Sequence, residues 1–317
     1  ALISIFVIPG GLLKFMKKQL VKRKHVLDAT AMVMLVVLCA SWGIQQVSIK
    51  YANQGISPIL QSGLRSVFAT ILIWIWMIAR RQRILEKDGT LWWGIAAGLL
   101  FTGEFLLIYW GLDFTYASRS AIFLYLSPFV VAIGSQLFIP GERLRKIQVI
   151  GLCCAFVGIV VTFGESLTLP TNKVLIGDGM LVIAAVLWGA TTVLIKASPL
   201  AQIAPSKTLL YQLGISAVIL PFGSLAIGEP GIVKITPLIG ICLVYQIVWV
   251  AFVTYLLWFW LIRNYPVARL TSFTFLTPLF GVIAGGLLLN EAITSSLLLA
   301  LVLVAIGIFL VNRPLRN

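Results

Sequence analysis

The sequence predicts an all-α membrane protein with ten transmembrane helices, arranged as two inverted five-helix repeats. Ten apolar stretches of about twenty residues fill most of the 317-residue chain, and residues 26–164 resemble residues 175–312 in order. Each half holds five spans, an odd number, so the first half ends on the side of the membrane opposite its start. The second half therefore begins on that side and is inverted relative to the first. The composition agrees, since 60% of the residues are hydrophobic, 11% are charged and the mean hydropathy is +1.04. Such a composition excludes a soluble domain of this length.

Each predicted span is long enough to cross a hydrocarbon core of roughly 30 Å at about 1.5 Å per residue. The apolar runs are longer than a strand and show no short alternating pattern, which favours a helical bundle over a barrel. The predicted spans are 27–50, 57–80, 91–112, 118–139, 145–164, 175–197, 207–228, 237–262, 267–289 and 293–312.

The Lys and Arg residues that give the net charge of +14 lie mostly on one predicted side of the membrane. In the ten-span arrangement nineteen of the 24 Lys and Arg residues lie on one side and four on the other, with Arg65 inside a span. This bias is the positive-inside pattern, so we expect both termini in the cytoplasm. A basic surface for nucleic acid is the alternative, and the sorting of the charges disfavours it.

Residues 1–25 are predicted to form a basic cytoplasmic tail that anchors the first span. Residues 1–13 are apolar but too short to cross a membrane, and Met16 resembles a natural start. We therefore expect residues 1–15 to be a cloning remnant or an upstream leader.

The sequence offers no pattern typical of enzyme chemistry. The only histidine, His25, lies in the tail, and the four cysteines lie inside apolar spans without metal-ligand spacing. No nucleotide-binding loop is present in the sequence. We expect no catalytic residue, no metal and no cofactor, and we interpret the cysteines as small buried hydrophobic residues.

The repeat includes residue types that chance similarity between apolar helices would not match. Order is kept throughout, and the offsets drift only from 146 to 150 residues. The matched pairs are Trp42-Gly43 with Trp188-Gly189, Arg119 with Arg269, Ser127-Pro128 with Thr277-Pro278, and Glu142 with Glu291.

With these motifs the chain resembles the drug/metabolite transporter superfamily, in particular its ten-span members with two EamA-type repeats. In overall character it is similar to bacterial amino-acid exporters of the YddG type. The resemblance implies a secondary transporter in a bacterial inner membrane, with a small-molecule substrate held between the halves. It does not imply one substrate, because relatives move amino acids, nucleotide sugars, phosphorylated sugars and drugs. A proton-coupled drug or metabolite exporter and a sugar-phosphate or nucleotide-sugar exchanger therefore stay open, as does the oligomeric state.

Two charged residues are predicted at matching depth inside the membrane. Arg65 and Glu104 each lie eight residues from the outer end of a span, about 12 Å deep. Charged groups at such depth usually face a cavity or a partner. One interpretation is a structural ion pair. The other is that either group contacts the carboxylate or ammonium of the substrate, or that Glu104 carries a proton.

A polar face recurs on the first and sixth spans. Trp42, Gln46 and Lys50 are spaced four residues apart, and the second repeat has Trp188, Thr192 and Lys196 in the same places. This pattern predicts a surface that faces a central cavity, with lysines near its two mouths. The alternative is an interfacial tryptophan followed by a lysine that reaches to the membrane surface.

Further rings and two prolines complete the predicted pathway. Tyr109, Tyr245 and Trp249 are candidate cavity residues, and a cavity of rings and amides suits a neutral or zwitterionic solute. Pro128 and Pro278 lie mid-span in equivalent helices, where each leaves the carbonyl four residues earlier without its helical partner. We interpret them as flexing points for alternating access, with a static kink as the alternative. Together with the resemblance to amino-acid exporters, these features lead us to expect export of aromatic or neutral amino acids across the lipid bilayer.

Overall fold

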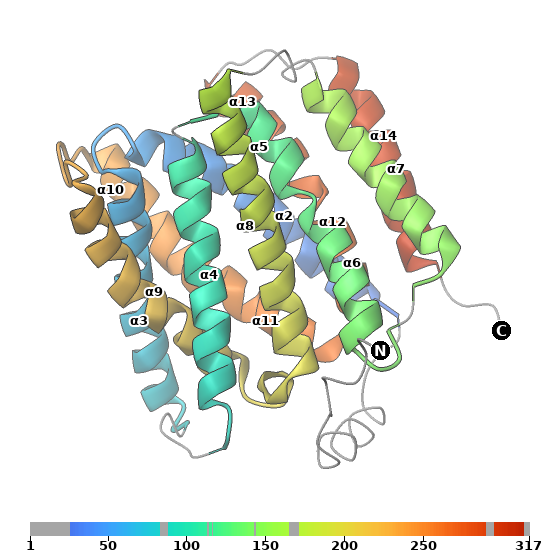
Figure 1. Cartoon of the computed structure of the whole chain (residues 1–317), viewed down its shortest axis with the longest axis horizontal. Coiled ribbons are helices and arrows are strands. Elements are labelled where there is room, and N and C mark those ends of the chain that lie inside the picture. The colour runs from blue at the N-terminus through green and yellow to red at the C-terminus, as the bar shows by residue number, and fades with distance from the viewer. Residues whose placement is uncertain are drawn as a thin grey trace.

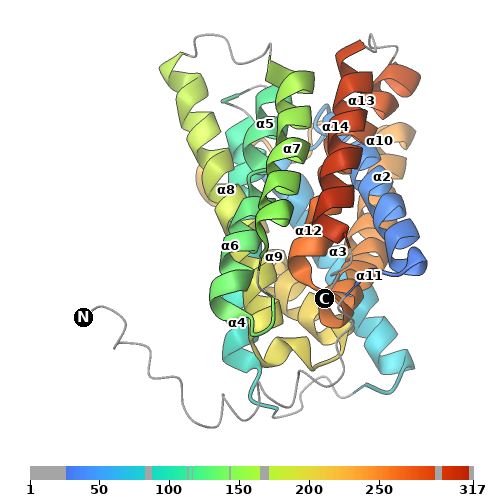
Figure 2. The ribbon, with the colours of Figure 1, turned by 90° about the vertical axis from the view of Figure 1, so that its right-hand side faces the viewer.

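A computed structural model describes residues 26–82, 88–112, 114–115, 117–142, 144–164, 171–289 and 295–313. These residues form a bundle of long helices that run side by side (Figures 1 and 2). The regular structure in these ranges is helical, apart from one isolated antiparallel bridge between Ile56 and Ile232. The predicted basic tail 1–25 and Glu291 lie outside the described residues.

The helices follow the predicted spans closely. The first half holds α2 (Ala29–Ala52), α3 (Pro58–Ala79), α4 (Leu91–Leu112), α5 (Ala117–Leu124), α6 (Ser127–Phe138) and α7 (Lys146–Phe163). The second half holds α8 (Asn172–Ala197), the 3-10 turn η2 (Pro199–Ala201), α9 (Pro205–Ile227), α10 (Pro237–Val244), η3 (Tyr245–Thr254), α11 (Tyr255–Asn264), α12 (Val267–Phe273), α13 (Leu276–Leu289) and α14 (Ser295–Asn312).

Eight helical stretches of the described chain are long and apolar enough to cross a membrane. The other two predicted spans correspond to shorter apolar helices, Lys146–Val161 in α7 and Leu298–Asn312 in α14. The protein is therefore an all-α, multi-pass membrane protein in the part that the structure describes. The count of ten spans and the inverted orientation of the halves stay predictions.

The fourth and ninth spans are interrupted just before their prolines. Helix α5 ends at Leu124 and α6 begins at Ser127, while α12 ends at Phe273 and α13 begins at Leu276. A proline lacks the N–H that would bond the carbonyl four residues earlier and its ring clashes with that carbonyl, so a break one turn ahead of Pro128 and Pro278 follows directly. The sequence predicted a bend here, and the structure has a break in the helix.

The eighth span contains a segment of π-helix that the sequence did not predict. Residues Tyr245–Thr254 form this segment, between α10 and α11. A π-helix is wider than an α-helix and shifts the faces on which later residues lie, and such segments are often found at functional sites.

Equivalent contacts recur between the two halves. A Cβ added at Gly43 of α2 would lie 2.8 Å from the carbonyl oxygen of Thr277 in α13. A Cβ at Gly189 of α8 would lie 3.3 Å from the carbonyl oxygen of Ser127 in α6. These two contacts join matched residues of the repeat, so each half packs its Trp-Gly helix against a broken helix. In both cases the partner is the broken helix of the opposite half.

The contacts between α7 and α14 also join residues that are matched by the repeat. The two helices lie side by side at one edge of the bundle (Figures 1 and 2). A Cβ at Gly151 would lie 2.7 Å from the carbonyl oxygen of Gly307, and one at Gly158 would lie 3.0 Å from that of Ala300. With an offset of 149 residues, Gly151 corresponds to Ala300 and Gly158 to Gly307, so each contact is the repeat equivalent of the other. Small residues let the helices approach closely, as in other membrane bundles.

Candidate functional site

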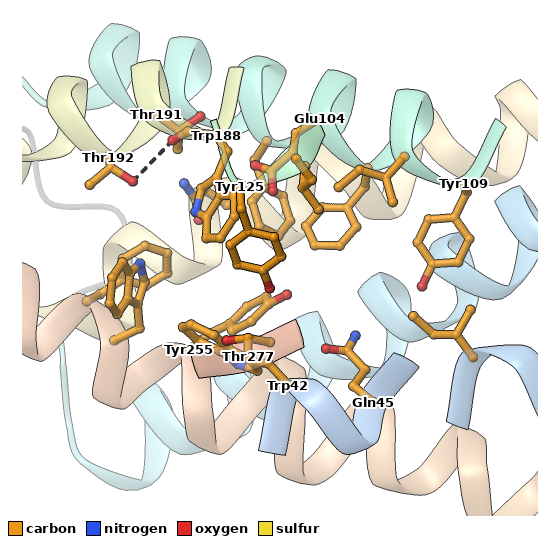
Figure 3. Close-up of a pocket in the computed structure, with 18 of the residues that line it drawn as sticks. Trp42, Gln45, Glu104, Tyr109, Tyr125, Trp188, Thr191, Thr192, Tyr255 and Thr277 are labelled. Carbon is orange, nitrogen blue, oxygen red and sulfur yellow. Dashed lines mark hydrogen bonds between the residues drawn. The ribbon is translucent and has the colours of Figure 1, made fainter. Parts of the chain in front are cut away.

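A cavity lies between the halves, with an empty volume of ≈ 970 Å³ that includes its open mouth. Helices α2, α4, α8, α9 and α11 contribute to its wall, together with the broken ends at α5 and α13 (Figure 3). Nine aromatic residues dominate the lining: Trp42, Phe101, Phe105, Tyr109, Tyr125, Trp188, Tyr255, Trp258 and Phe259. The polar lining residues are Gln45, Glu104, Ser120, Thr191, Thr192, Gln212 and Thr277, and the aliphatic ones are Ile49, Ile108, Leu124 and Ile195.

Glu104 is the charged side chain among the described lining residues. It projects from α4 and is 6% exposed. In the described structure its carboxylate forms no ion pair within 4.0 Å and no hydrogen bond. A buried carboxylate without a protein partner is costly in a low-dielectric site. It is therefore well placed to bind a group that enters the cavity.

Arg65 lies behind the wall and not in it. The side chain is fully buried in α3, and its guanidinium carbon is 4.1 Å from the centroid of the Phe105 ring. Phe105 lines the cavity, so one aromatic ring separates the guanidinium from the empty space. The ion pair with Glu104 that the sequence suggested as one interpretation is not formed in this structure.

The two repeat tryptophans lie on opposite walls of the cavity (Figure 3). The Trp42 indole N–H donates to the Thr254 hydroxyl at 3.0 Å, and its ring meets Trp258 edge-on with centroids 5.4 Å apart. Trp188 meets Tyr125 edge-on at 5.9 Å. These contacts fix the ring orientations, so the cavity has preformed aromatic walls.

The EamA-like transporter family matches this chain twice, over residues 29–164 and again over residues 175–313. The chain belongs to this family. A solved crystal structure superposes with a TM-score of 0.78 at 17% identity, covering 90% of this chain and 96% of its own, which shows a shared fold. An uncharacterized transporter of Bacillus subtilis, YoaV, is 23% identical over 85% of this chain and 92% of its own length.

Two similar proteins carry a functional description. A "probable amino-acid metabolite efflux pump" of Salmonella typhimurium is 26% identical over 85% of this chain and 90% of its own length. A protein of the same description from Escherichia coli is 24% identical over 88% and 93%. The family and these names indicate a membrane transporter and not an enzyme. The recognition made from the repeat motifs is confirmed.

The sequence candidates divide into two groups in this EamA-like transporter. Those that line the cavity are Trp42, Glu104, Tyr109, Trp188 and Thr192. Arg65 lies behind Phe105, and the side chain of Gln46 lies outside the described part of the chain.

Tyr245 and Trp249 lie away from the cavity. Both donate to Ser41, at 2.9 Å to its carbonyl oxygen and 2.9 Å to its hydroxyl respectively, and Trp249 is 40% exposed on the outer surface of the bundle. Both residues belong to the π-helix, so an α-helical spacing could not predict which face they occupy.

The sequence reasoning missed Gln45 and Thr191, which are equivalent residues. On α2 the cavity face is Trp42, Gln45 and Ile49, and on α8 the equivalent residues are Trp188, Thr191 and Ile195, with Thr192 beside them. The spacing is therefore three and then four residues, with an offset of 146 at each position. A polar residue three places after each tryptophan was the signal that could have found them.

Lys196 does not lie at a mouth of the cavity. It is 1% exposed, and its ammonium donates to the carbonyl of Ile262, to that of Arg263 at 3.3 Å and to that of Tyr265 at 2.7 Å. These carbonyls end α11, which carries Trp258 and Phe259 of the cavity wall. A cation at a helix C-terminus satisfies free carbonyls and the helix dipole.

Proposed function

We propose that this EamA-like transporter exports aromatic or neutral amino acids, or closely related zwitterions, by alternating access. The observation that carries the proposal is the cavity lining, in which one carboxylate stands among aromatic rings and amides. Glu104 with the faces of nearby rings suits an ammonium group, and the rings suit an apolar side chain. A phosphorylated substrate would need several converging Arg or Lys side chains, and the described lining contains none. The efflux description of two relatives supports the same class.

The second candidate is an exporter of organic cations or drugs that is coupled to protons. One acidic side chain in an aromatic cavity would also bind such a cation. The two functions differ in the need for a carboxylate on the solute. Vesicles that contain the purified protein are expected to transport neutral and aromatic amino acids and to leave cationic dyes and nucleotide sugars unmoved. Transport of dyes without any amino acid would reject the first proposal and favour the second.

We propose that the ten spans place both termini in the cytoplasm of a bacterium, with the second half inverted relative to the first. The charge bias and the recurrence of the Gly43 and Gly189 contacts support this arrangement. Reporter fusions after residue 55 and after residue 85 are expected to report the periplasm and the cytoplasm respectively. The same side for both fusions would contradict the proposed topology.

We propose that spans four and nine deform near Pro128 and Pro278 during transport. Their interruptions lie at the cavity wall, where Leu124, Tyr125 and Thr277 line the empty space. The double variant Pro128→Ala, Pro278→Ala is expected to bind substrate with nearly unchanged affinity but to transport it severalfold more slowly. Binding and initial transport rates measured on one preparation test this. Unchanged transport would show that the two prolines serve helix packing and not the transport motion.

A further inference from the structure

A cluster of buried polar groups without partners lies beside the cavity. In the described structure the Ser62 hydroxyl, all three nitrogens of the Arg65 guanidinium and the Tyr109 hydroxyl are buried and form no hydrogen bond. Buried polar groups are almost always satisfied, and a guanidinium carries five N–H donors. The Ser62 and Tyr109 hydroxyls lie near each other, and the Tyr255 hydroxyl lies near the guanidinium, but none of these pairs has hydrogen-bond geometry. The unsatisfied donors therefore indicate an acceptor group that is absent from the protein itself.

The three side chains converge. Ser62 and Arg65 are three residues apart on α3, so they share one face of that helix. Tyr109 comes from the neighbouring α4, where its hydroxyl lies next to Ser62 and close to the charge of Arg65. The cluster thus joins two helices of the first half.

The cluster reaches the cavity at one end. Tyr109 lines the cavity at the end opposite Thr192 (Figure 3). Phe105, one turn earlier on α4, covers the face of the guanidinium and has its centroid 6.3 Å from that of Tyr109. Phe105 and Tyr109 therefore separate the guanidinium from the empty space, and a ligand reaches Arg65 when these two side chains move apart.

The chemistry of the missing group follows from the donors. A guanidinium and two hydroxyls match an anion with two acceptor oxygens, and a planar carboxylate accepts from a guanidinium with both oxygens. Glu104 does not fill this role, because it forms no ion pair with Arg65 here. Hydrogen bonds of this kind strengthen when water is excluded, as at this depth in the bundle.

We infer that Arg65, Ser62 and Tyr109 form a subsite for the carboxylate of the transported amino acid, while Glu104 binds its ammonium group. The inference rests on the proposed amino-acid substrate and deepens it. The substrate spans the distance between two opposite charges that do not pair with each other in the empty cavity. Under this division a cation without a carboxylate leaves the Arg65 subsite unoccupied and binds more weakly than an amino acid.

The test compares each amino acid with its amide, which keeps the ammonium and removes the negative charge. L-phenylalanine with L-phenylalaninamide and L-alanine with L-alaninamide serve as probes, and affinity is measured by ligand-dependent thermal stabilisation of the purified protein. The wild type is expected to bind the acid roughly tenfold or more tightly than the amide. In Arg65→Gln this ratio is expected to approach one. Ser62→Ala and Tyr109→Phe are expected to lower it severalfold each, and they keep the test decisive if Arg65→Gln does not fold.

Arg80→Gln is the matched control. Arg80 follows the same helix, is exposed, and also covers an aromatic ring, with its guanidinium carbon 4.6 Å from the centroid of Trp76. This variant is expected to keep the wild-type ratio. A wild-type ratio in folded Arg65→Gln, or in both hydroxyl variants, would overturn the subsite and leave Arg65 with a structural role.

Two further arms separate this inference from the proposed function. If no amino acid binds, the proposed function fails, and 3-phenylpropionate then tests the subsite alone. Stabilisation of the wild type but not of Arg65→Gln by this acid supports the subsite, and no stabilisation overturns it. Replacing sulfate in the buffer by chloride tests whether an inorganic anion occupies the subsite. Arg65-dependent stabilisation by chloride, with acid and amide bound equally, would reject the assignment to the substrate.

Discussion

Replacing Glu104 by glutamine is expected to lower transport of zwitterionic amino acids by roughly ten- to a hundredfold, since a charge-assisted hydrogen bond contributes about 1.5–3 kcal/mol. The melting temperature is expected to change little, because the carboxylate has no hydrogen bond or ion pair within 4.0 Å in the described structure. Initial transport rates and melting curves on the same purified variant test both expectations.

Glu229→Gln provides the matched control for a carboxylate with a structural role. Glu229 accepts hydrogen bonds from the backbone N–H groups of Ile59 and Leu60, each at 3.0 Å, at the start of α3. Its replacement is expected to lower the melting temperature and to leave the preference for zwitterions unchanged. A Glu104→Gln variant that loses stability and transport in equal proportion would contradict the assignment of Glu104 to the substrate.

Lys196→Met is expected to lower the free energy of unfolding by roughly 3 kcal/mol, the upper end for hydrogen bonds to a charged group. The substitution leaves the carbonyls of Ile262, Arg263 and Tyr265 without their shared donor in a buried place. For a protein of this size the melting temperature should fall by roughly 5–10 °C. Thermal unfolding in detergent measures the effect.

Lys173→Met on the same helix provides the comparison. Lys173 is exposed at the start of α8, with its ammonium 5.6 Å from the centroid of the Phe114 ring. Exposed cations of this kind contribute little to stability, so the melting temperature of this variant should stay close to that of the wild type. Equal melting temperatures for both variants would show that the Lys196 contacts do not stabilise α11.

The positions of the helices were predictable because local chemistry determines them. The predicted span 91–112 coincides with α4, and the predicted span 57–80 differs from α3 (Pro58–Ala79) by one residue at each end. Apolar length and a proline in the first turn are signals within the segment itself. The breaks before Pro128 and Pro278 have the same local origin.

The interior of the cavity was only partly predictable. The tryptophans and Glu104 stood out as polar or aromatic residues that recur or lie at depth. The positions of Lys196 and Arg65 depend on contacts with distant segments, which the spacing along one helix does not contain. Tyr245 and Trp249 were assigned to the cavity on the assumption of regular α-helical geometry, and the π-helix invalidates that assumption.

The π-helix also makes the length of the eighth span as important as its composition. Each residue of an α-helix turns the chain by about 100°. A π-helix turns the chain by less per residue, so rewinding Tyr245–Thr254 as an α-helix of unchanged length would rotate its two ends relative to each other by an angle on the order of 100°. Tyr255 and Trp258 would then turn away from Trp42, although no cavity residue had been changed. Deletion of one residue in this segment would offset that rotation, so the winding and the length of the segment together hold Tyr255 and Trp258 at the cavity.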